Sequence, residues 1–165
     1  MTSNISENSD KRPPFPKFRC IEQNLEAPKI DQVEEETTRV LKNYNLEHYI
    51  DTEDVVAITG SSRGIAHQNQ ILKGIVKEIK NAGGEPFVFP AMGSHGGANA
   101  EGQIGLLNEY GITETFVGCP IKASMEVVNI GNSKFGEPIY IDKHASEADK
   151  IVILNRIKAH SKFVG

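Results

Sequence analysis

The sequence predicts an α/β fold, in which a mostly parallel sheet is flanked by helices and a small antiparallel element lies near residues 126–141. Residues 55–58 and 86–90 are short apolar runs bounded by turn residues, which is typical of buried parallel strands. Between them, residues 65–81 carry apolar side chains on one helical face and lysines on the other. Because a strand–helix–strand crossover is right-handed, we expect the two strands to run parallel.

Two further helices are expected on either side of this unit. The first begins at Asp31, which can cap it, and Glu34 stands three residues later in the position of a capping box. The second covers residues 100–110 and ends at Gly111.

The remaining segments predict shorter elements. Residues 115–117 favour a short strand. Two β-rich runs, 126–130 and 138–141, are joined by a glycine-containing turn and predict the antiparallel pair. Residues 144–148 predict one or two helical turns, and the apolar run at 151–154 predicts another buried strand.

The length of 165 residues suits one domain. Residues 1–16 are mostly serine, asparagine, proline and charged residues, so we expect a disordered N-terminal tail. Residues 17–165 are expected to form the domain. We expect this domain to be incomplete at its C-terminal end, because the chain stops on a polar loop directly after the last strand.

Charge and cysteine content exclude several classes of partner. The net charge is -4, and lysines and arginines are scattered rather than clustered, so no nucleic-acid partner is expected. Cys20 and Cys119 fit neither a disulfide framework nor a zinc site, which favours a reducing, cytoplasmic location. No apolar run approaches the ~20 residues of a membrane span, so no membrane partner is expected.

The loop after the first strand has the composition of an anion site. Residues 59–64 read TGSSRG and open a helix, whose N-terminal N–H groups attract anions. Arg63 adds a guanidinium that can bind a phosphate or carboxylate through two bonds. The simpler interpretation is a tight turn with a solvent-facing arginine.

The loop after the second strand carries a histidine among glycines. Residues 90–103 read PAMGSHGGANAEGQ, and Gly96 and Gly97 allow the backbone around His95 to approach a ligand closely. A lone histidine is more often structural than catalytic, but this glycine context favours a ligand site.

The loop after the last strand carries Lys158 and His160. In a parallel sheet, the loops that follow the strands open on the same edge. We therefore expect Arg63, His95, Lys158 and His160 to converge around an anionic ligand.

Residues 55–66 also resemble the nucleotide-binding turn of short-chain dehydrogenases. The last glycine of that pattern is replaced by Ala66, however. Tyr140 and Lys143 are three residues apart, whereas the catalytic pair of that family is four apart. The match therefore indicates an anion-binding turn rather than a dehydrogenase.

Three motifs together resemble the N-terminal domain of the nickel-dependent lactate racemase family, and more closely its hydroxy-acid racemase and epimerase relatives. They are the glycine–histidine motif at 90–103, the segments GCPI at 118–121 and SMEVV at 124–128, and NRIK at 155–158 with His160 and Phe163 after it. The resemblance covers roughly residues 15–165.

The resemblance implies an isomerase that uses a nickel-pincer nucleotide and passes hydride between this cofactor and a small 2-hydroxy acid. His95 and His160 stand at the positions of the two catalytic histidines, which exchange the hydroxyl proton on opposite faces of the substrate. The residues implied to bind the cofactor are Ser62, Arg63, Gly64, Gly96 and Gly97. Arg63 is expected to contact either the cofactor phosphate or the substrate carboxylate. Lys158, placed by its position after the last strand, is also expected to bind the substrate.

The chain departs from the family at two points. Ser61 and Ser62 fill a position where members often carry an acidic residue, which argues against lactate itself as the substrate. The cofactor-tethering lysine and the nickel-ligating histidine of the family would lie beyond Gly165. No residue here is therefore assigned to the metal, and we expect the chain to be inactive alone.

A non-catalytic α/β module that binds a nucleotide or phosphate is the alternative from another class. The sequence predicts neither the particular hydroxy acid nor the oligomeric state.

Overall fold

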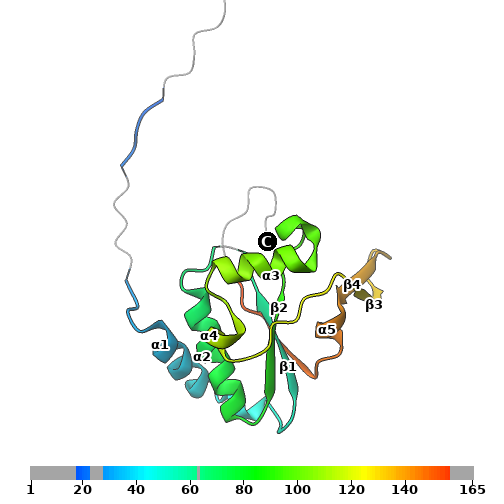
Figure 1. The fold of residues 1–165 in the computed structure, drawn as a ribbon, viewed down its shortest axis with the longest axis horizontal. Helices are drawn as coiled ribbons and strands as arrows, with labels where there is room; N and C mark the ends of the chain where they lie inside the picture. Colours follow the sequence, from blue (N-terminus) through cyan, green and yellow to red (C-terminus); the bar gives the residue numbers. More distant parts are fainter. Residues whose placement is uncertain (1–17, 23–27, 63, 157–165) are drawn as a thin grey trace, which may run out of the picture.

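A computed structural model describes residues 18–22, 28–62 and 64–156, so the predicted tail at 1–16 lies outside the described residues. The main sheet has the strand order β2–β1–β5, and both pairings are parallel. The strands are β1 (Val55–Gly60), β2 (Glu85–Pro90) and β5 (Lys150–Val152). Figure 1 shows helices packed around this sheet, which confirms the predicted α/β class.

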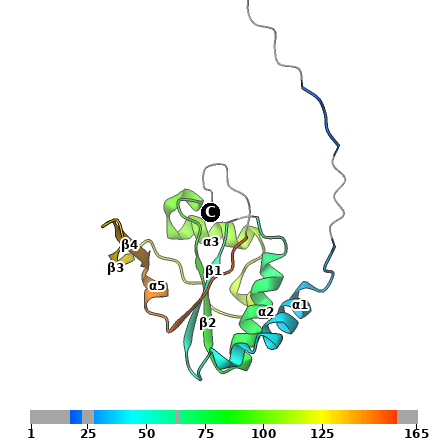
Figure 2. The same cartoon turned by 180° about the vertical axis from the view of Figure 1, so that it is seen from behind.

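The helices are α1 (Val33–Asn43), α2 (Gln68–Asn81), α3 (Ala100–Glu109), α4 (Glu114–Val117) and α5 (Lys143–Ser146), with short 3-10 helices η1 (Leu46–His48) and η2 (Gly96–Ala98). A two-stranded antiparallel hairpin is formed by β3 (Val127–Asn132) and β4 (Pro138–Asp142), as predicted. In Figures 1 and 2, α1 and α2 lie on one side of the sheet, whereas α5 and the hairpin lie on the other.

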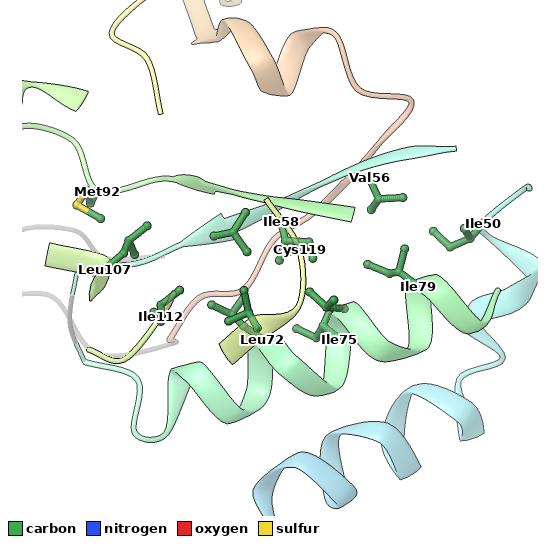
Figure 3. Close-up of a cluster of buried hydrophobic side chains, with 13 residues drawn as sticks. Ile50, Val56, Ile58, Leu72, Ile75, Ile79, Met92, Leu107, Ile112 and Cys119 are labelled. Carbon is green, nitrogen blue, oxygen red and sulfur yellow. The ribbon is translucent and has the colours of Figure 1, made fainter. Parts of the chain in front are cut away.

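The larger core lies between the sheet and α2 (Figure 3). Val56 and Ile58 extend from β1 toward α2, whose Leu72 and Ile79 meet them, and all four side chains are completely buried. Burying one such side chain contributes about 1.5–3 kcal/mol. This layer therefore fixes α2, and with it the loop between β1 and α2, against the sheet.

The opposite face of the sheet has a smaller core. It consists of Ala57 and two phenylalanines, Phe87 and Phe89, covered by Ala145 of α5. On the outer side of α2, α1 comes close at Gly74, where an added Cβ would lie 3.0 Å from the Glu34 carbonyl oxygen.

The third helix, α3, lies across the carboxyl ends of β1 and β2 (Figure 1). Its Leu107 is completely buried, and a Cβ added to Gly60 at the end of β1 would lie 3.1 Å from the Leu107 Cδ2 atom. The contact fixes α3 at the edge where the predicted site lies.

The predicted strand at 115–117 is wrong, because this segment is the helix α4. Thr113 caps the helix by accepting a hydrogen bond at 3.2 Å from the Phe116 N–H. Gly118 then ends it in the left-handed conformation at φ +81°. The two end signals outweigh the β-propensity of the residues between them.

The predicted capping box of α1 is also wrong. Gln32 occupies the cap position without a side-chain hydrogen bond. Glu34 instead forms an ion pair at 2.9 Å with Lys73 of α2. α2 begins at Gln68 rather than at residue 65, because His67 before it adopts a left-handed φ of 54°.

The run at 151–154 forms the predicted strand only as far as Val152, and that strand is not buried. Ile151 is 42% exposed and Ile153 is 76% exposed. Within the described part of the chain, β5 pairs with β1 alone, so it forms an edge of the sheet. An apolar run of this kind cannot indicate whether a neighbouring strand covers it.

Candidate active site

Three loops leave the same edge of the main sheet. They follow β1, β2 and β5, which run parallel, so their carboxyl ends point the same way. The predicted common edge is confirmed. Arg63, Lys158 and His160 lie outside the described residues, and their convergence with His95 stays a prediction.

The imidazole of His95 contacts the hydroxyl of Ser62. His95 follows β2 and Ser62 follows β1, and the distance from Nδ1 to Oγ is 2.6 Å. His95 is exposed and Ser62 is half-buried. Since Nδ1 is engaged, Nε2 is the nitrogen that can meet a ligand.

Gln103 of α3 holds the loop that carries His95. This side chain is only 4% exposed. Its Nε2 donates to the Gly93 carbonyl oxygen at 2.9 Å and to the His95 carbonyl oxygen at 3.4 Å. The loop is thus attached to a rigid helix through its own backbone.

A second attachment joins Gly96 to Gly102 of α3. A Cβ added to Gly96 would lie 2.6 Å from the Gly102 carbonyl carbon, which is too close for any side chain. The missing side chain of Gly96 is therefore required by packing. Gly97 and Gly64 differ from Gly96, because their neighbours are side chains rather than backbone. A Cβ added to Gly97 would meet Asn99 Nδ2 at 3.0 Å, and one added to Gly64 would meet the Arg156 side chain at 3.8 Å.

The loop after β1 is anchored by Ser61. In the amide orientation that satisfies both groups, Gln68 accepts from the Ser61 N–H at 2.7 Å and donates to the Ser61 carbonyl oxygen at 3.2 Å. Gln68 is 5% exposed. The Ser61 hydroxyl also donates to the Leu154 carbonyl oxygen at 3.5 Å.

The segment after β5 is tied to the same place. The Thr59 hydroxyl accepts from the Leu154 N–H at 2.8 Å and donates to the Leu154 carbonyl oxygen at 3.2 Å. Two residues later, Arg156 Nη1 donates to the Gly64 carbonyl oxygen at 3.0 Å. The three loops are therefore connected to one another by hydrogen bonds.

Sequence reasoning missed Gln103 and Arg156. Arg156 stands just beyond a strand end, which is the signal that identified Lys158. The same reasoning could therefore have identified Arg156. Gln103 lies in a helix whose contacts with the His95 loop form only on folding. No local sequence pattern identifies this residue.

The described residues can bind and orient an anionic ligand and exchange a proton with it. An exposed imidazole with one fixed nitrogen suits proton exchange with a bound ligand. The exposed Arg156 guanidinium beside Gly64 suits a carboxylate or phosphate. Within the ranges that the structure describes, no group of three or more His, Cys, Asp or Glu residues is placed to hold a metal ion.

Comparison with known proteins identifies the family. The chain matches the lactate racemase N-terminal domain over residues 13–165, which is almost its whole length. No curated protein matches it. In the described ranges, no helix combines the length and apolar character needed to cross a membrane. This chain belongs to the lactate racemase N-terminal domain family.

Proposed function

We propose that this chain is the cofactor- and substrate-binding N-terminal part of a racemase or epimerase of 2-hydroxy acids that uses a nickel-pincer nucleotide. The observation that carries the proposal is His95, an exposed imidazole on a loop fixed to α3, with Nδ1 held by Ser62. The family match supports the reaction class.

The described edge fits the nucleotide part of such a cofactor. The Ser62 hydroxyl and the Arg156 guanidinium are donors suited to phosphate. Gly64, Gly96 and Gly97 would contribute through their backbones, because a neighbouring residue occupies the side-chain direction of each. No described residue is assigned to the nickel, because no ligand cluster exists among them.

When bound, the nickel-pincer nucleotide would supply the acceptor for a hydride from the substrate α-carbon. The residues of this chain exchange protons with the substrate and position it. His95 Nε2 takes the proton of the substrate hydroxyl on one face, and the proposed second histidine, His160, serves the other face. Two imidazoles suit this role, because each face needs its own group that can accept and donate a proton. Arg63 and Lys158 are proposed to hold the substrate carboxylate.

The test uses the full-length protein loaded with its cofactor. His95→Ala should abolish interconversion of the enantiomers or epimers of a 2-hydroxy acid, measured by chiral chromatography on a panel of substrates. His48→Ala is the matched control, because His48 is exposed in η1, away from the three loops. Near-normal turnover of the His95 variant would overturn the proposal.

A module that binds a mononucleotide without catalysis is a second candidate. It is favoured by the hydrogen bond between Arg156 and Gly64, which places a guanidinium beside the glycine-containing loop after β1. Calorimetry with nucleoside monophosphates would support this candidate if binding were found and the loaded full-length protein turned over no 2-hydroxy acid.

A further inference from the structure

We propose that Ser62 is the positioning residue of His95: its hydroxyl accepts a hydrogen bond from Nδ1–H and keeps Nε2 unprotonated and directed to the substrate. The catalytic use of Nε2 rests on the proposed function, but the pairing itself does not. The distance from Oγ to Nδ1 is 2.6 Å, and the two residues are 33 apart in the chain.

Ser62 is held in place on its side of the contact. β1 and β2 are in register up to the pair Gly60–Pro90, and the Ala91 N–H donates to the Gly60 carbonyl oxygen at 2.8 Å. Ser61, directly before Ser62, is fixed by the buried Gln68. The backbone that leads into Ser62 is therefore held in place by hydrogen bonds.

His95 is held in place on the other side. Its N–H donates to the Met92 carbonyl oxygen at 3.3 Å, and its carbonyl oxygen accepts from the Ala98 N–H at 3.3 Å. Gln103 adds a further donor to that carbonyl at 3.4 Å. With both backbones fixed, the remaining freedom of the imidazole is rotation of its side chain, which the Ser62 hydroxyl restricts.

A hydroxyl is well suited to this partner role. It accepts a hydrogen bond from Nδ1–H both in the neutral imidazole with a free Nε2 and in the charged imidazolium. The contact can thus persist while His95 gains and returns a proton. Because the hydrogen bond at Nδ1 sets the tautomer, Nε2 stays available for the substrate.

The neighbouring serine provides a control within the same loop. Ser61 has the same side chain, but its hydroxyl bonds to the Leu154 carbonyl oxygen, and its anchoring to Gln68 uses backbone atoms that a substitution retains. Ser61→Ala should therefore leave the His95 ring unaffected, whereas Ser62→Ala removes its partner.

The experiment is ¹⁵N NMR of the histidine rings in the 165-residue chain, with the His95 signals assigned from a His95→Gln variant. We expect His95 to be mainly the Nδ1–H tautomer in the parent and in Ser61→Ala. In Ser62→Ala it should revert toward the Nε2–H tautomer that free histidine prefers, and Ser62→Thr should restore the parent pattern. An unchanged tautomer ratio in Ser62→Ala would overturn the proposal.

A second measurement uses the cofactor-loaded full-length protein. Ser62→Ala should lower kcat about 100-fold with little change in KM, because a misplaced reacting group costs this much, and Ser62→Thr should recover most of it. A parent-like kcat in Ser62→Ala would overturn the positioning role. If NMR shows the expected tautomers but the parent protein turns over no 2-hydroxy acid, only the proposed function fails.

Discussion

Gly96 and Gly102 touch through their backbones, so closely that neither can carry a side chain. A Cβ added to Gly102 would lie 2.0 Å from the Gly96 carbonyl oxygen. The contact fastens the loop of His95 to α3. We expect Gly102→Ala to displace this loop and to lower the free energy of unfolding by about 2 kcal/mol or more, as overpacked sites do. Urea denaturation measures the loss.

Gly105 provides the matched control in the same helix. A Cβ added there would meet nothing within 4 Å, so Gly105→Ala should stabilise the protein by about 0.5–1 kcal/mol through helix propensity alone. Equal effects of the two substitutions would contradict the role assigned to the Gly96–Gly102 contact.

Gln103 should tolerate replacement by glutamate poorly near neutral pH. Its amide nitrogen donates to the carbonyl oxygens of Gly93 and His95 from a buried position. A carboxylate of the same shape has no hydrogen to donate and is repelled by both carbonyls. We expect Gln103→Glu to destabilise the protein by roughly 1–3 kcal/mol, and hydrogen exchange to become faster in the loop at 91–98.

Acid should reverse part of this loss. Burial and the two carbonyl oxygens favour the protonated form of the introduced carboxyl, so its pKa is raised in the folded state. The part of the penalty that comes from the negative charge is therefore absent well below the carboxyl's ordinary pKa range and grows as the pH rises through and above it. A variant as stable as the parent at neutral pH would show that Gln103 does not hold the loop.

The parallel sheet and its site edge were predictable because local signals and one topological rule suffice for them. The run at 55–58, the amphipathic pattern after it and the run at 86–90 define a crossover unit, and the handedness rule then places both following loops on one edge. The position of His95 at this edge was predictable for the same reason, since it follows the second strand, whereas its catalytic role stays a prediction.

The errors arose where a segment's state depends on distant or terminal residues. The helix α4 was signalled by Thr113 and Gly118 at its ends, yet the β-prone residues between them dominated the prediction. Glu34 forms an ion pair with Lys73, 39 residues away, instead of capping α1. The support that Gln103 gives to the His95 loop likewise exists only after α3 has packed against the sheet edge.

The hydroxyl of Thr59 joins β1 to the segment that follows β5. It makes two hydrogen bonds with the backbone of Leu154, at 2.8 and 3.2 Å, and its side chain is largely buried. Thr59→Val keeps the shape but removes both bonds, and should cost about 1–3 kcal/mol because the Leu154 groups lose their partner. Thr59→Ser retains the hydroxyl and should lose less. Thermal denaturation compares the two, and a valine variant more stable than the serine variant would contradict this role.

The two cysteines should differ strongly in reactivity. Cys119 is 5% exposed, and burial raises the pKa of its thiol to about 11, whereas Cys20 is exposed. The thiolate is the nucleophile, so near pH 8 an alkylating reagent should label Cys20 rapidly and Cys119 only after denaturation. Mass spectrometry of the labelled peptides tests this, and rapid native labelling of Cys119 would contradict it.

The same raised pKa gives a pH dependence of known sign. An unfolded chain ionises the Cys119 thiol near its ordinary pKa of about 9, but the folded chain ionises it only near 11. The unfolded state therefore binds fewer protons than the folded state between these values, and stability falls as the pH rises across that window. Lysines and tyrosines titrate in the same range, so the comparison is with Cys119→Ala. The free energy of unfolding should fall more steeply from about pH 9 to about pH 11 in the parent than in the variant, and parallel curves would show that burial of this thiol does not couple its ionisation to folding.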